Sequence, residues 1–141
     1  MATRALINIV ERKEGRSFSK QLEPSAIHTQ IYNHYDGYPS GLGVTLANYL
    51  DGYNVVNGLT HDSYQGPLAN GIGCLSAQLV SYLKNEPGNM YLQPPQERDW
   101  ESWEYFIWIK EHEEIMISIF NYDNECKFVG TPQELINKYE E

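Results

Sequence analysis

Alternation of apolar and polar side chains predicts two strands in the first third of the chain. Residues 3–10 place Ala5, Ile7 and Ile9 on one face, and residues 26–33 carry β-branched and aromatic side chains with the same period of two. The second strand therefore has one apolar side and one polar side. The polar side either holds a site or faces water.

The clearest hairpin in the chain joins residues 103–110 to residues 115–120. Its strands carry bulky apolar side chains at consecutive positions, such as Phe106 and Ile107, so both of its faces are hydrophobic. Strands of this kind lie in the middle of a sheet or are covered on both sides. An uncovered second face would instead be a surface for a partner.

Helical spacing of leucines and tyrosines predicts two central helices, at residues 40–50 and 66–85. A third helix is predicted after a capping box. Thr131 is its cap, Pro132 takes the first helical position, and the side chain of Glu134 reaches back to the cap. The chain therefore ends in a short helix.

Two shorter strands, residues 90–92 and 126–129, complete the predicted sheet, and the polar stretches 11–24 and 51–65 are predicted to be loops. Strands and helices in this order indicate an α+β protein. We expect a single domain, residues 1–141, with a mainly antiparallel sheet, two central helices and a short C-terminal helix.

Residues 31–43 form the one stretch that ordinary packing does not explain. It crowds tyrosines, His34, Asp36 and glycines into the passage from a strand to a helix. Gly41 and Gly43 are poor helix formers, which indicates that some group approaches the backbone closely there. The residues of this turn predicted to bind a ligand are Tyr32, His34, Tyr35, Asp36, Tyr38, Gly41 and Gly43.

A metal site is one interpretation of this turn. His34 and Asp36 can ligate one ion, and His61 and Asp62 in the following polar segment can supply further ligands. The spacing lacks the tight signature of zinc or manganese enzymes, so no metal is predicted. The simpler interpretation is that Asp36 caps the helix and His34 bonds to nearby backbone.

Anion binding is a second interpretation, because the turn runs from a strand into a helix N-terminus. Residues 37–43 match neither the dinucleotide fingerprint nor the P-loop pattern, and they contain no Lys or Arg. If a nucleotide binds, the tyrosines can stack on its base. Covalent catalysis is disfavoured, since no serine or cysteine lies in a nucleophile motif.

The charged side chains are distributed unevenly along the chain. Of the net charge of −9, residues 86–141 contribute thirteen acidic and four basic side chains, whereas residues 1–85 carry six of each. General nucleic-acid binding is disfavoured because it depends on Lys and Arg, and a basic protein surface is the natural complement. Neither a membrane span nor a signal peptide is predicted, so we expect a cytoplasmic chain. Cys74 and Cys126 are predicted to be buried thiols.

Carboxylates and large rings concentrate near the C-terminal hairpin and suggest a docking surface, on which rings anchor the partner and carboxylates steer it. A solvated acidic face that aids solubility is the alternative. The predicted partner-binding residues are Glu101, Trp103, Glu104, Trp108, Glu111, Glu113 and Glu114.

Three segments, residues 2–7, 32–43 and 128–135, resemble a family of small uncharacterised proteins found in bacteriophages and bacterial mobile elements. The central turn, His34-Tyr-Asp-Gly-Tyr-Pro39, is the distinctive piece, and the resemblance spans most of the chain. The family brings no catalytic residues. It implies a context, since small phage proteins often bind and disable a host factor, as anti-CRISPR and other anti-defence inhibitors do.

The sequence therefore predicts a non-enzymatic accessory protein without a cofactor. It is expected to bind and inhibit a host protein, such as a CRISPR-type defence or nucleic-acid-processing complex, through an acidic aromatic surface. The alternative is a small-molecule or nucleotide site, or a metal-dependent enzyme, built on the turn from His34 to Gly43. The identity of the partner and the oligomeric state are not predicted.

Overall fold

The computed structural model of the chain describes residues 2–14, 24–57, 66–110 and 114–140. Its strands are β1 (Ala5–Glu14), β2 (Ile27–Asn33), β3 (Asn54–Val56), β4 (Leu68–Asn70), β5 (Met90–Gln93), β6 (Trp103–Lys110), β7 (Glu114–Asn121) and β8 (Cys126–Gly130). Its α-helices are α1 (Val44–Leu50), α2 (Gly71–Leu83) and α3 (Pro132–Tyr139), with a 3-10 turn at Pro24–Ala26 and a π-helical turn at Pro39–Gly43.

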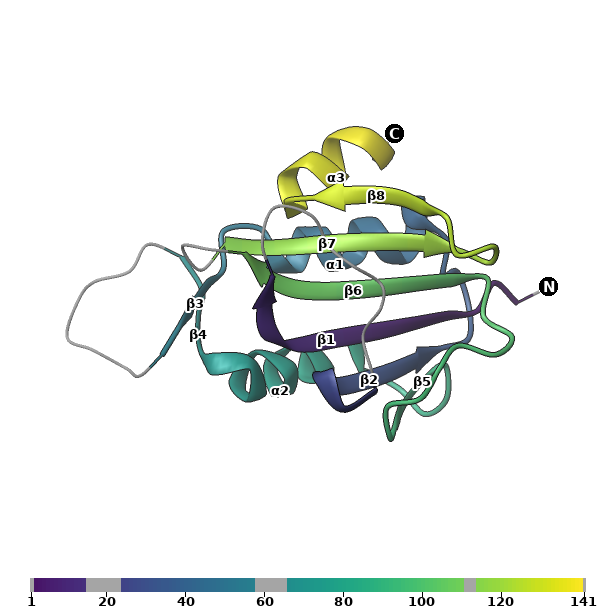
Figure 1. Cartoon of the computed structure of the whole chain (residues 1–141), viewed down its shortest axis with the longest axis horizontal. Coiled ribbons are helices and arrows are strands. Elements are labelled where there is room, and N and C mark those ends of the chain that lie inside the picture. Colours follow the sequence, from purple (N-terminus) through teal and green to yellow (C-terminus); the bar gives the residue numbers. More distant parts are fainter. Residues whose placement is uncertain (1, 15–23, 58–65, 111–113, 141) are drawn as a thin grey trace.

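Six strands form one mixed sheet in the order β5-β2-β1-β6-β7-β8. β1 and β6 are parallel neighbours in its middle, and the other neighbouring pairs are antiparallel. Figure 1 shows the first strand of the chain lying against a strand from its last third. The predicted α+β class is confirmed, and the sheet is antiparallel only in part because its two halves join through a parallel pair.

Helices α1, α2 and α3 contribute to a core on one face of this sheet (Figure 1). Ile7 and Ile107 point into that core from the central strands, and Leu46, Leu79 and Leu135 point into it from the three helices. Complete burial of each such side chain contributes about 1.5–3 kcal/mol. Among the described helices, none has the length and apolar content needed to cross a lipid bilayer.

The opposite face of the hairpin β6–β7 is buried too. Its cluster comprises Val10, Phe106, Trp108, Met116 and Phe120. Phe106 and Phe120 meet edge to face with ring centroids 5.7 Å apart. The hairpin therefore lies centrally with both faces covered, as predicted, and the alternative of an exposed apolar face for a partner is wrong.

Several element boundaries differ from the prediction, and α1 begins only at Val44, after the π-helical turn, rather than at residue 40. Residues 11–14 continue β1, and residues 68–70 form β4, so α2 begins only at Gly71. β4 pairs in parallel with β3, which lies inside the stretch 51–65 that was predicted to be a polar loop. The central residue of β4, Ala69, is fully buried. Strands of three residues are too short to show a period of their own.

The two cysteines differ in environment. Cys74 on α2 is half-buried, Cys126 at the start of β8 is exposed, and both thiols are free. The predicted burial of Cys126 is wrong because β8 is an edge strand of the sheet.

Candidate functional site

The turn after β2 is held by its own backbone. The Gly37 N–H donates to the carbonyl of Thr3 at 2.8 Å, and the Leu42 N–H donates to the carbonyl of Asp36 at 3.1 Å. Asp36 has a φ of 57°, in the left-handed region that Asp tolerates better than most residues. Its carbonyl, not its side chain, accepts the bond from the following helical turn, so the predicted side-chain cap is not formed.

Close approach to the turn glycines is real, but the approaching groups belong to the chain itself. A Cβ on Gly41 would lie 2.9 Å from the Asp36 carbonyl oxygen and 2.9 Å from the Tyr38 ring. Gly43 is buried against Tyr105 and Leu135. Gly41 therefore shapes the corner, and neither glycine lines the open cleft beside it. The Tyr38 hydroxyl donates a hydrogen bond of 3.5 Å to Asp36 Oδ1.

An open cleft of about 750 Å³ lies beside this corner. The N-terminal side of the cleft comes from β2 and its turn, and the other side comes from the segment that leads into β5. Two hydrogen bonds join the sides: His34 N–H donates to the Asn89 carbonyl at 2.9 Å, and Tyr35 N–H donates to Asn89 Oδ1 at 2.8 Å. We call it the tyrosine cleft, lined by Tyr32, His34, Tyr35, Asp36, Glu86, Pro87, Gly88, Asn89 and Tyr91.

Four of the nine residues that line the tyrosine cleft carry aromatic rings. The rings of His34 and Tyr35 meet edge to face at 4.5 Å, and those of Tyr32 and Tyr91 lie 6.1 Å apart. Tyr35 is 56% exposed and Tyr91 is 52% exposed, so both rings are accessible from solvent. These rings present faces and edges to a ligand.

The Tyr32 hydroxyl lies 2.8 Å from His34 Nδ1. Burial raises the pKa of this phenol, the nearby charge of Arg4 lowers it, and Glu101 and Tyr91 raise it further, for a net increase. The phenol is therefore protonated at neutral pH. When it donates to Nδ1, the Nε2 of the neutral imidazole carries the ring proton.

The charged groups that line the tyrosine cleft are the exposed carboxylates of Asp36 and Glu86. Aromatic faces carry partial negative charge as well. These carboxylates and ring faces therefore favour a positively charged or hydrogen-bond-donating ligand over an anion.

The acidic residues predicted to bind a partner do not form one exposed surface. Glu104 is 4% exposed, accepts a 2.9 Å hydrogen bond from Asn8 Nδ2, and has Oε1 3.9 Å from Arg98 Nε. Glu101 is also buried and accepts from the Asp99 N–H at 2.9 Å. Of the other three predicted glutamates, Glu114 is exposed, and Glu111 and Glu113 lie outside the described residues.

The predicted anchoring rings are interior as well. Trp108 is fully buried, and its indole N–H donates to Ser118 Oγ at 2.8 Å. Trp103 is half-buried and packs against the helix-side core. The sequence-based docking surface is therefore corrected: on central strands, a side chain on either face is covered by a neighbouring layer.

Among the described residues, no group of three His, Cys, Asp or Glu side chains is arranged to hold a metal ion. His61 and Asp62, the further ligands considered for a metal, lie outside the described part of the chain.

Sequence analysis missed the second wall of the tyrosine cleft. The sequence pattern predicts that residues 86–89 end a helix and that Tyr91 belongs to a short strand, and neither prediction indicates a site. Their place beside Tyr32 follows from the register of β5 against β2, in which Tyr91 is the partner of Tyr32. One signal of the cleft was present in the sequence: the period of two places Tyr32 and His34 together on the polar side of β2.

Comparison of the chain with protein-family models, with curated proteins and with solved structures finds no match.

Proposed function

We propose that the tyrosine cleft binds a cationic side chain of a partner protein. The proposal rests on one observation. The rings of Tyr32, Tyr35 and Tyr91 and the carboxylates of Asp36 and Glu86 line the same open cleft. A Lys or Arg head group over an aromatic face gains about 0.5–2 kcal/mol, and carboxylates at the rim add Coulomb attraction.

The chain itself contains a small version of this interaction. The Lys84 ammonium lies 5.5 Å from the centroid of the Tyr91 ring. The ring of a cleft residue thus accommodates a cation within the folded protein. A partner's Arg or Lys entering from solvent meets the same kind of ring, with Tyr35 and the two carboxylates close by.

Net charge favours the same class of partner. With a charge of −9, the chain attracts basic surfaces over long range and accelerates their encounter. The expected wider role, an accessory protein of a phage or mobile element that inhibits a host protein in the cytoplasm, is part of this proposal. The docking element is now the cleft rather than the hairpin.

An uncharged planar ring, such as a nucleobase, is the second candidate ligand. The tyrosine rings offer stacking surfaces, and Arg4 lies close enough to Tyr32 to influence its pKa. Asp36 and Glu86 oppose phosphate groups, so a nucleoside fits this candidate better than a nucleotide.

The test is calorimetric titration with a short peptide rich in Arg and Lys, and with a Glu-substituted peptide of the same length. We expect binding of the basic peptide alone, weakened by added salt. Tyr35→Ala and Tyr91→Ala should each reduce its affinity about fivefold, equivalent to about 1 kcal/mol. Tyr122→Ala is the matched control, because Tyr122 is 60% exposed and does not line the cleft.

Equal affinity for the two peptides, or an equal effect of Tyr35→Ala and Tyr122→Ala, would contradict the proposal. Adenosine that binds more tightly than the basic peptide, and loses affinity in the Tyr35 variant, would favour the second candidate instead.

A further inference from the structure

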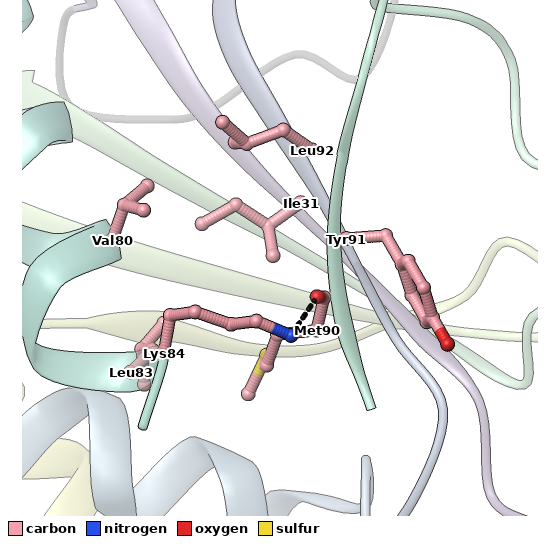
Figure 2. Close-up of a pocket in the computed structure, with 7 residues that line it drawn as sticks. All are labelled: Ile31, Val80, Leu83, Lys84, Met90, Tyr91 and Leu92. Atoms are coloured by element: carbon pink, nitrogen blue, oxygen red, sulfur yellow. Dashed lines mark hydrogen bonds between the residues drawn. The ribbon is translucent and has the colours of Figure 1, made fainter. Parts of the chain in front are cut away.

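A separate apolar pocket of about 340 Å³ lies on the helix side of the sheet, between the end of α2 and the edge strand β5. Figure 2 shows Ile31 at its centre, with Val80 on one side and Leu92 above. Lys84 and Met90 border it below (Figure 2). Its volume is at the lower end of the range of about 300–1,000 Å³ typical of small-molecule sites.

The pocket is open to solvent at the sheet edge. Ile31 is 3% exposed and forms a buried wall, whereas Leu92 is 64% exposed and forms the rim. These two residues are register partners in β2 and β5, so their side chains lie next to each other on the same face. An apolar group that enters between α2 and β5 is therefore removed from water on several sides at once.

Lys84 is the one charged residue in the lining, and it is fixed in place. Its Nζ donates to the carbonyls of Gly88 and Met90, both at 2.8 Å, and its aliphatic stem runs along the pocket (Figure 2). An ammonium group has three donors, and these two bonds use two of them. Lys84 is exposed, and its Nζ also lies 5.5 Å from the centroid of the Tyr91 ring. Its remaining N–H can donate to an acceptor that reaches this side chain from solvent.

From this arrangement we infer that the pocket binds a small amphipathic carboxylate, with an alkyl chain among Ile31, Val80 and Leu92 and a carboxylate at Lys84 Nζ. Both parts of the ligand follow from the lining. The walls offer apolar area and almost no polar partners, and the single fixed cation selects an anionic head group. This inference does not rest on the proposed function. The two sites share Tyr91, but Tyr35 lines the tyrosine cleft and not this pocket, and Val80 lines this pocket and not the cleft.

Titration with straight-chain carboxylates from hexanoate to decanoate, below their micelle concentrations, tests the inference. Each added methylene should strengthen binding about fourfold until the pocket is filled. Decylammonium, with the same chain and the opposite charge, should bind at least about tenfold more weakly than decanoate. Chemical shifts of Ile31 and Val80 methyl groups report whether the chain occupies this pocket.

Two variants separate the two parts of the ligand. Val80→Phe should abolish binding of decanoate by filling the pocket, while Val129→Phe on the exposed edge strand β8 should leave it unchanged. Lys84→Met keeps the apolar stem and should remove the preference for carboxylate over ammonium. Tyr35→Ala should not alter decanoate binding, so failure of this inference and failure of the proposed function are distinguishable.

Binding without chain-length dependence, or equal binding of decanoate and decylammonium to the wild-type protein, would overturn the inference. So would a homodimer, detected by light scattering, that dissociates in Val80→Phe, because a second copy of the chain would then occupy the pocket.

Discussion

At the scale of single residues, two glycines of the same corner differ in whether a Cβ would fit at their positions. A Cβ on Gly37 would lie 2.7 Å from both Ala5 Cβ and the Thr3 carbonyl oxygen, atoms at the start of the sheet that cannot move independently. A Cβ on Gly43 would meet Tyr105 at 3.4 Å, an ordinary contact, and Gly43 has helical dihedrals with a φ of −57°.

Alanine at these two positions should therefore act in opposite directions. Gly37→Ala is expected to lower the free energy of unfolding by about 1–3 kcal/mol through overpacking. Gly43→Ala is expected to be neutral or to raise it by up to about 1 kcal/mol, because alanine favours the helix. Urea titration of both variants measures the difference, and a similar loss in both would contradict this account of the corner.

At the scale of elements, the sequence predicts well whatever a local pattern determines. The hairpin β6–β7 has long strands with strong β propensity, and the capping box of α3 is a pair of reciprocal bonds within four residues, Glu134 N–H to Thr131 Oγ1 and Thr131 N–H to Glu134 Oε1. Strands β3 and β4 were missed because each draws its stability from its partner, not from its own three residues.

The capping box offers a test at this scale. Thr131→Ala removes the acceptor of the 3.2 Å bond from Glu134 N–H and should destabilise the protein by about 1 kcal/mol. Thr45→Ala, at an exposed position inside α1, is the matched control and should be neutral or slightly stabilising. Amide hydrogen exchange should show the loss concentrated in α3; equal unfolding midpoints for the two variants would argue against the cap.

At the scale of the whole molecule, the parallel pairing of β1 and β6 decides which side chains are interior, and no local pattern encodes it. Glu104 illustrates the consequence, since a glutamate near the chain's acidic end was predicted to face a partner. Pairing instead opposes it to Leu6 and buries it beside Asn8 and Arg98. The tyrosine cleft has the same origin, because its two walls meet only through the pairing of β2 with β5.

A row of buried polar side chains crosses the strands at this junction. Gln30 of β2 donates to Asn8 Oδ1 at 2.7 Å, and Asn8 of β1 donates to Glu104 of β6 at 2.9 Å. Gln93 of β5 extends the row by donating to Gln30 Oε1 at 2.6 Å. Because a shift of register by one residue would separate these partners, the row favours this pairing of strands over its alternatives.

The buried pair Arg98–Glu104 and the exposed pair Lys127–Glu125 have the same nitrogen-to-oxygen distance of 3.9 Å but differ in burial. Glu104→Leu leaves the Arg98 guanidinium buried without this carboxylate and Asn8 without its acceptor, and should cost about 3–5 kcal/mol of unfolding free energy. Glu125→Leu should cost no more than about 1 kcal/mol, since exposed pairs contribute little. Adding Arg98→Leu to Glu104→Leu should restore part of the loss, because the double variant no longer buries a guanidinium that has lost this carboxylate. The restoration is partial because the bonds from Arg98 to the Tyr122 carbonyl and Asn124 are lost as well. Denaturant unfolding of the wild type and of these three variants measures the differences, and a double variant less stable than Glu104→Leu alone would show that the row acts through packing rather than charge.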